Sequence, residues 1–249
     1  GSIPTLPPRQ TGRDPEACGT GDRPSERLFV NSDGGLRNAV VLVEGVSGGK
    51  PMPPALQNAQ MEQSNCEYVP HLTVMAAGTD IGILNNDPTL HNVQFFQDND
   101  TLFNIAQPVQ GQVNSTRVEN AGFIDVECAV HGWMSASVVV VDNPYYAVTD
   151  ENGRFELSRA QPGTITAERP GWHSAEWEWD GEALVTEIAL APRVIRGLHI
   201  GSNVFADARE WQQILDVADK TVVNAFVIDV KDEAGRVFFN SQVTLAREI

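Results

Sequence analysis

The chain has 249 residues, with 17 Lys or Arg against 33 Asp or Glu, and its formal net charge is −16. Such a surface repels nucleic-acid phosphates and anionic lipid, so the charge argues against a nucleic-acid or membrane-surface role. Hydrophobic residues make up 41% of the chain, which is enough for a folded core. No apolar run reaches the length of a membrane span, and the length allows more than one domain.

The first 26 residues are rich in Pro, Gly and charged side chains and show no hydrophobic periodicity. We therefore expect an extended N-terminal arm over 1–26. The chain begins with Gly1 and Ser2 rather than Met, which is typical of a processed or cloned start. We expect a periplasmic or secreted protein whose signal peptide has been removed.

The chain has three cysteines, Cys18, Cys66 and Cys128, and no Cys-x-x-Cys pair. One metal ligand plus a disulfide between Cys18 and Cys66 would use all three, and this fits an oxidising compartment. Two alternatives stay open: three unpaired structural cysteines, or Cys66 as a second thiolate for the metal. A disulfide at Cys18 would tether the N-terminal arm.

From 27 to 145 the sequence alternates short apolar runs with turn residues. The runs are enriched in β-branched and aromatic residues, and Gly, Asn and Pro separate them, which favours a β-sandwich. The expected strands are 39–43, 71–75, 79–84, 92–96, 123–127 and 137–141.

A second, smaller all-β region is expected from 146 to 193. Its predicted strands are 146–149, 154–157, 164–168 and 184–190, and turns at 150–153 and 161–163 separate the first three. We interpret this region as an accessory β segment.

The pattern changes again from 194 to 249. A short strand at 197–200 is followed by Asp207, which is suited to cap a helix, and then by an apolar strand at 224–230. This order predicts one βαβ unit with parallel strands. Because one such unit does not cover both faces of its strands, we expect the chain to end inside a larger, truncated barrel domain.

Candidate metal ligands occur in two segments. Cys128, His131 and Met134 follow one another at intervals of three residues, between two expected strands. A type I copper site needs one thiolate, two imidazoles and a weak axial thioether, and His91 is the strong candidate for the remaining imidazole. We expect Gly132 to permit the turn that brings Met134 toward the metal.

Other accounts of these residues stay open. Each alone is more often an ordinary buried or surface residue, and zinc accepts Cys and His as readily as copper does. Met134 favours copper over zinc.

The order His91-Asn92-Val93, followed by a Cys-x2-His-x2-Met loop, resembles the cupredoxins, particularly the plastocyanin and amicyanin type. The resemblance implies a Greek-key cupredoxin β-sandwich over 27–145, one type I copper, and electron transfer between Cu(I) and Cu(II). It implies that Asn92 pins the two ligand loops together. It also implies a redox protein partner, for which a basic c-type cytochrome fits the acidic surface.

Segment 144–155 is similar to a carboxypeptidase-regulatory-like β segment of plastocyanin-like secreted proteins. Segments 197–202, 224–236 and 243–249 resemble the opening of a glycoside hydrolase-like (β/α) barrel family. This resemblance implies that Asp229 contributes to sugar binding in a complete enzyme, whereas a structural carboxylate is an equally good account. The alternative function is therefore an accessory module joined to an N-terminal fragment of a carbohydrate-active enzyme.

Two further residues have open roles. His71 lies near Cys66 in sequence and is either an outer group of the site, an extra ligand or a structural residue. Trp133 lies inside the ligand loop and either shields the metal, forms an apolar docking patch or fills the core. The chain by itself is expected to be an electron carrier and not a catalyst.

Overall fold

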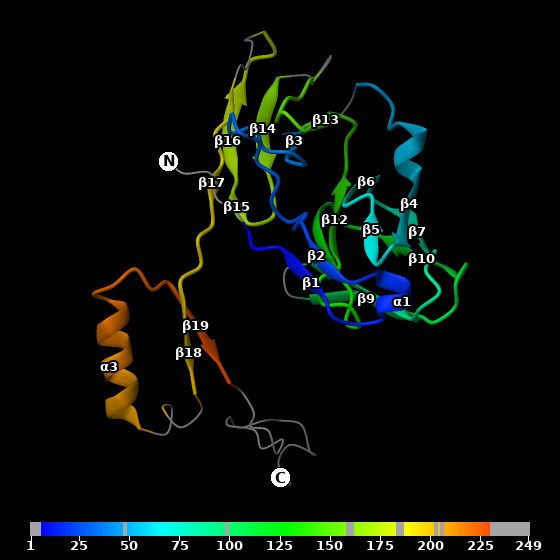
Figure 1. Cartoon of the computed structure of the whole chain (residues 1–249). Helices are drawn as coiled ribbons and strands as arrows, with labels where there is room; N and C mark the ends of the chain where they lie inside the picture. Colours follow the sequence, from blue (N-terminus) through cyan, green and yellow to red (C-terminus); the bar gives the residue numbers. More distant parts are fainter. Residues whose placement is uncertain are drawn as a thin grey trace, which may run out of the picture. The chain divides into compact units, whose positions relative to one another are not determined.

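Figure 1 shows a computed structural model of the chain, which describes residues 6–46, 49–97, 100–157, 162–182, 187–201, 204 and 207–229. The chain divides into two compact units, Gly1–Ala191 and Pro192–Ile249, and each is described by itself. The fold is mainly β, as the sequence predicts. The finer domain boundaries at 26, 145 and 193 stay a prediction.

The first unit contains a β-sandwich. One sheet has four strands in the order β10 (Val113–Val118), β7 (Thr79–Asn85), β4 (Asn58–Ser64) and β5 (Glu67–Val69). The other has five in the order β6 (Leu72–Ala76), β12 (Ser135–Val141), β11 (Gly122–Glu127), β8 (His91–Gln97) and β9 (Asp100–Gln107).

The strand order is of the Greek-key kind. β7 pairs with β10 in one sheet, whereas the two strands between them in sequence, β8 and β9, form a hairpin in the other sheet. Each sheet also contains one parallel pair of strands distant in sequence, β4 with β7 and β6 with β12. The remaining pairs in these two sheets, among the described strands, are antiparallel.

The sandwich core comes from alternate residues of these strands, because successive side chains of a strand point to opposite faces. The inward side chains include Met61, Ile81, Ile83, Val93, Phe95, Ile124, Val126, Val138 and Val140, all of them buried. The same packed cluster reaches Cys128 and Met134 at one end of the sandwich. The candidate ligands therefore lie on a rigid support.

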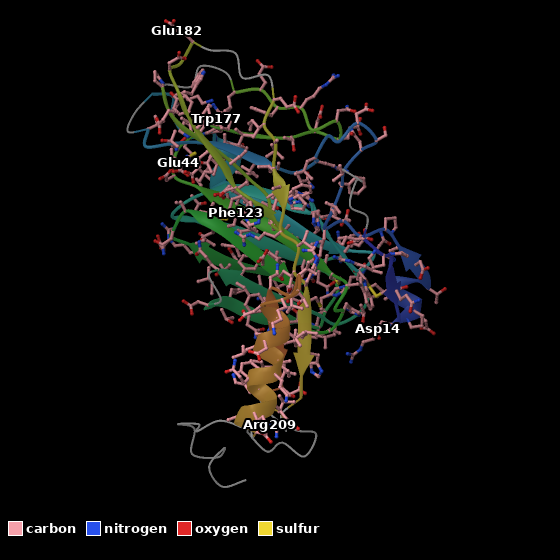
Figure 2. All side chains as sticks on the ribbon, turned by 90° about the vertical axis from the view of Figure 1, so that its left-hand side faces the viewer. Asp14, Glu44, Phe123, Trp177, Glu182 and Arg209 are labelled. Atoms are coloured by element: carbon pink, nitrogen blue, oxygen red, sulfur yellow. A yellow bond between two sulfur atoms is a disulfide. The ribbon has the colours of Figure 1, made fainter. Side chains whose placement is uncertain are left out.

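A third sheet packs against β6 and β12 on the outer face of the five-stranded sheet. Its order is β13 (Tyr146–Val148), β3 (Val40–Glu44), β14 (Gly163–Glu168) and β16 (Ala175–Trp179). Val40 of β3 packs with Val139 and Val141 of β12 in a second core cluster, with Phe123 at its margin (Figure 2). All seven residues of β12 are buried. Its last four residues, Val138–Val141, form an apolar run because the outward-facing Val139 and Val141 are covered as well as the inward-facing residues.

Two details of the predicted accessory β segment differ from the structure. Segment 154–157 forms no strand; its backbone leaves the tight turn at Asp150–Gly153, and Phe155 packs against a third cluster. Of the predicted strand 184–190, residues 184–186 lie outside the described residues, and 187–190 are not a strand. Strand β16 takes the sheet position instead, with Trp177 against the third cluster (Figure 2).

The N-terminal arm has more structure than an extended chain. A two-stranded ribbon of β1 (Arg9–Thr11) and β2 (Gly21–Arg23) encloses the short helix α1 (Pro15–Cys18). Cys18 forms a disulfide with Cys66, the pairing expected from the sequence. The disulfide holds this arm to the turn between β4 and β5.

The second unit contains the predicted βαβ elements. β18 (Gly197–Ile200) and β19 (Ala225–Ile228) are parallel, and helix α3 (Ala208–Ala218) lies between them in sequence. Asp207 caps α3 by accepting hydrogen bonds from the backbone N–H groups of Arg209 and Glu210. No helix among the described residues is long and apolar enough to cross a membrane.

The turn at Asp150–Gly153 gives a direct test of backbone conformation. Gly153 has φ of 73°, and a Cβ there would lie 2.7 Å from the Cα of Gly35. We expect Gly153→Ala to lower the free energy of unfolding by about 1–3 kcal/mol. The control is Gly132→Ala, because a Cβ at Gly132 meets no heavy atom within 4 Å. Equal denaturant midpoints for both variants would contradict the expectation.

Candidate metal centre

Strand pairing brings the two candidate ligand segments together. β11 runs antiparallel to β8, with Glu127 opposite Gln94. The end of β11 therefore lies beside the start of β8, and Cys128 follows the one while His91 begins the other. His131 and Met134 come from the loop that connects β11 to β12, whose turn is closed by a bond from the Met134 N–H to the His131 carbonyl (2.9 Å).

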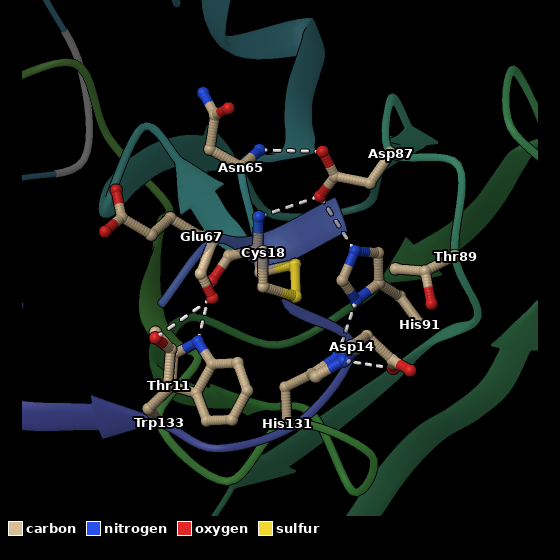
Figure 3. Close-up of a disulfide and its surroundings, with 12 residues drawn as sticks. Thr11, Asp14, Cys18, Asn65, Glu67, Asp87, Thr89, His91, His131 and Trp133 are labelled. Carbon is tan, nitrogen blue, oxygen red and sulfur yellow. Dashed lines mark hydrogen bonds and ion pairs between the residues drawn. A yellow bond between two sulfur atoms is a disulfide. The ribbon is translucent and has the colours of Figure 1, made fainter. Parts of the chain in front are cut away.

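Three donor atoms converge at this end of the sandwich, and Figure 3 shows the two imidazoles among them. Nδ1 of His91 lies 3.0 Å from Nδ1 of His131, and Sγ of Cys128 lies 3.8 Å from the same His131 nitrogen. Both imidazoles are 0% exposed and Cys128 is 3% exposed. His91, Cys128 and His131 thus form a group whose ligand atoms all lie within 4.8 Å of one another.

The Cys128 sulfur also accepts backbone hydrogen bonds. The donors are the N–H groups of Asn92 at 3.5 Å and His131 at 3.4 Å. Such bonds stabilise negative charge on sulfur and are a means of tuning a metal-bound thiolate.

Asn92 connects the ligand segments to one another and to β9. Its Oδ1 accepts the Ala129 N–H at 3.3 Å, and its Nδ2 donates to the Ile105 carbonyl at 3.1 Å. Tyr68 makes a second connection, because its hydroxyl bonds to the carbonyls of Asn92 (2.8 Å) and Glu127 (3.1 Å). Burial raises the pKa of Tyr68, which keeps this hydroxyl protonated.

The outer nitrogen of His91 meets a carboxylate that the sequence analysis did not identify. Nε2 of His91 lies 2.8 Å from Oδ2 of the buried Asp87. Asn85 shapes this loop, since its Oδ1 accepts the Asp87 N–H and its Nδ2 donates to the Thr89 carbonyl. Burial lowers the pKa of His91 and favours the neutral imidazole, the form that binds metals.

The outer nitrogen of His131 meets a second carboxylate. Nε2 of His131 lies 2.9 Å from Oδ2 of Asp14, on the N-terminal arm (Figure 3). This hydrogen bond lowers the pKa of Asp14. The ring of Trp133 packs against His131, with centroids 5.0 Å apart. Trp133 also packs against the sandwich core, and its role stays a prediction.

Cys66 joins these surroundings together. Its sulfur bonds to Cys18, its N–H donates to Asp87 at 2.8 Å, and its carbonyl accepts from Trp133 Nε1 at 3.1 Å. The disulfide also lies at the site, because its sulfur atoms fall within 4.8 Å of donor atoms of both His91 and His131. Cys66 is thus a disulfide partner and not a second thiolate.

The donor chemistry fits copper. One thiol sulfur and two imidazole nitrogens are the equatorial set of a type I copper site, and a buried position excludes water from it. Met134 is 2% exposed and packs in the same core cluster as Cys128. The role of Met134 as the axial ligand stays a prediction.

The structure places His71 apart from the converging donor atoms and gives Gly132 no special backbone conformation. His71 Nδ1 lies 3.5 Å from Glu26, and among the described residues His71 belongs to none of the groups of converging donor atoms. Gly132 lacks the positive φ that would require a glycine, so the turn before Met134 does not depend on it. Gly132 is compatible with the turn, but the backbone there does not require a glycine.

Parts of this chain are similar to known proteins. The family model described as "Putative glycosyl hydrolase domain" matches residues 197–249. No curated protein matches the chain in sequence.

Solved structures match part of the chain at low scores. A purple cupredoxin from Nitrosopumilus maritimus is 24% identical with TM-score 0.31, over 33% of this chain and 99% of that one. Amicyanin from Paracoccus versutus is 21% identical with TM-score 0.32, over 41% and 97%. A copper-containing nitrite reductase from Thermus scotoductus is 15% identical with TM-score 0.30, over 41% and 25%. At such TM-scores these likenesses carry no weight for the metal or the function.

His71 gives a test of pH-dependent stability. Burial, together with the guanidinium groups of Arg169, Arg9 and Arg27, lowers the pKa of His71 to about 4, although Glu26 lies beside it. The unfolded chain therefore binds one more proton between pH 6.5, the ordinary pKa, and about 4. The contribution of neutral His71 to the free energy of unfolding is therefore present above pH 6.5 and is lost as the pH falls toward 4.

We expect His71→Gln to remove up to about 3 kcal/mol of this acid-induced loss. The measurement is urea unfolding of the wild type and the variant between about pH 7 and about pH 4, the range in which His71 titrates. The exposed His173, as His173→Gln, is the control and should follow the wild-type profile. A wild-type profile for His71→Gln would contradict the assignment.

Proposed function

We propose that this protein is a type I copper-binding protein that carries electrons. The observation that supports this most is the buried convergence of His91 Nδ1, His131 Nδ1 and Cys128 Sγ. We propose Met134 as the fourth, axial ligand. Copper bound there would supply a one-electron couple, Cu(I)/Cu(II).

The chain's own contribution to such a couple is a site that keeps its shape. Each imidazole is held at its outer nitrogen, His91 by Asp87 and His131 by Asp14. Cys128 is held by two backbone N–H groups. Ligands that do not rearrange between oxidation states favour fast electron exchange, and a buried site keeps solvent from ligating the metal.

The proposed setting follows from the disulfide and the charge. The bond between Cys18 and Cys66 supports a periplasmic or secreted location, since disulfides persist in oxidising compartments. A net charge of −16 supports a basic redox partner, such as a small c-type cytochrome, and disfavours nucleic acid.

The test is a titration of the purified chain with Cu(II), followed by visible spectroscopy. We expect one equivalent to produce the intense absorption of a thiolate-to-Cu(II) charge transfer. Cys128→Ser should abolish this absorption. Met134→Leu should keep it and shift the reduction potential, because an axial ligand tunes the potential of such sites. A colourless one-to-one complex, or binding unchanged in Cys128→Ser, would contradict the proposal.

A second candidate function concerns the C-terminal unit. We propose that the chain consists of an N-terminal arm (1–26), a cupredoxin domain (27–145), a carboxypeptidase-regulatory-like β segment (146–193) and the start of a barrel domain (194–249). Two observations favour it: the family match at 197–249, and His199 Nε2 lying 2.9 Å from Asp229 Oδ1 at the ends of the parallel strands. Strand ends of this kind carry the catalytic groups of (β/α)8 barrels. The neighbouring acidic residues 232 and 233 lie outside the described residues.

This second function predicts a measurable activity only in a longer protein that completes the barrel. In such a protein, release of a chromogenic aglycone from a panel of aryl glycosides should depend on Asp229 and disappear in Asp229→Asn. Cys128→Ser is the matched control, because it alters the copper site and leaves the C-terminal unit unchanged. No release above buffer by the longer protein, or equal release by its Asp229→Asn variant, would reject the hydrolase role.

A further inference from the structure

The N-terminal arm makes contact with the ligand loop at three points. Arg9 Nη2 donates to Ser135 Oγ at 3.1 Å, and Arg13 Nη1 donates to the Val130 carbonyl at 3.4 Å. Asp14, the residue after Arg13, meets His131. The arm therefore follows the loop that carries three of the four proposed ligands.

Asp14 lies at the N-terminus of α1, but its side chain does not cap this helix. It is the N-cap of α1, where an aspartate commonly accepts a backbone N–H of the helix, yet its side chain makes no such bond. Its backbone is left-handed, with φ of 50°, which is costly for a residue other than glycine. The carboxylate is directed to His131 Nε2 instead (Figure 3).

The arm is also anchored independently of Asp14. Cys18, four residues further on, is bound to Cys66, and Arg23 pairs with Glu67 at 3.0 Å. Cys66 lies in the turn between β4 and β5, and Glu67 is the first residue of β5. The disulfide and the ion pair fix the position of α1, and so the position of the Asp14 carboxylate, against the metal centre.

We propose that the N-terminal arm is part of the metal centre, with Asp14 as a positioning residue for His131. This inference rests on the proposed copper function. With Nδ1 of His131 on the metal, Nε2 carries the proton and donates it to Asp14, so the carboxylate selects the tautomer and orients the ring. The same arrangement covers the outer edge of His131, which is 0% exposed.

Two carboxylates therefore act on the two imidazoles in the same way, one local and one distant. Asp87 lies four residues before His91, whereas Asp14 reaches His131 from 117 residues away. A carboxylate beside each outer nitrogen makes the imidazole a stronger electron-pair donor to the metal, and this favours Cu(II) over Cu(I). We expect the arm to lower the reduction potential as well as to tighten copper binding.

The test compares three variants of the arm in the full chain. Asp14→Ala should weaken Cu(II) binding by about 10–100-fold, the usual loss for such a carboxylate. Asp14→Asn keeps a hydrogen-bond acceptor and removes the charge, so it should bind more tightly than Asp14→Ala and raise the potential. The control is Asp22→Asn, which removes the same charge from exposed β2 of the same arm and should match the wild type.

A readout that needs no copper separates this inference from the proposed function. In metal-free protein labelled with 15N-histidine, the His131 Nε2–H should exchange slowly with solvent, and Asp14→Ala should speed its exchange. The double variant Cys18→Ser/Cys66→Ser should also speed it by loosening the arm. If the wild-type protein forms no coloured copper complex but its His131 Nε2–H exchanges slowly, the copper function is rejected and the role of the arm is kept. Wild-type exchange, affinity and potential in Asp14→Ala would overturn the role of the arm.

Discussion

The two fully buried imidazoles impose the main constraint on this structure. A buried ring nitrogen without a partner is costly, and His91 and His131 together bring four of them into one end of a β-sandwich. Their Nδ1 atoms face one another and Cys128, and each Nε2 atom faces a carboxylate. Asp87 requires the loop that Asn85 shapes, and Asp14 requires the N-terminal arm. The surroundings of the site follow from satisfying these nitrogens.

The rest of the first unit keeps this arrangement rigid. β12 is covered on both faces, by the sandwich core on one side and by the sheet containing β3 on the other. The strand that leaves the ligand loop is therefore fixed along its length. Cys66 adds a second restraint, since one residue holds Asp87, Trp133 and the arm through its N–H, its carbonyl and its sulfur. A metal bound here would meet ligands already in place, which suits electron transfer.

Sequence patterns identified strands whose alternate residues are apolar and missed strands richer in polar residues, such as β4 and β10. The core strands around Ile81, Phe95 and Ile124 were predicted because their apolar side chains follow the period of a strand. β10 (Val113–Val118) was not predicted, because it is an edge strand whose side chains are mostly exposed and polar. Segment 154–157 was predicted as a strand and is not one: its apolar residues pack against the third cluster without pairing to a neighbour.

The sequence alone determined the chemistry of the candidate site, because a Cys, a His and a Met at intervals of three on a loop between strands limit the ligand types locally, and the sequence supplied His91 as a second imidazole. Asp87 lies only four residues before His91, so its pairing with that imidazole could have been predicted from the sequence. Only the tertiary structure decided the contact between Asp14 and His131, since neither its sequence neighbours nor its spacing distinguish Asp14 from the other aspartates. Its contact with His131 depends on a disulfide and on a chain path that closes over 117 residues, and contacts of that range are set by the whole fold.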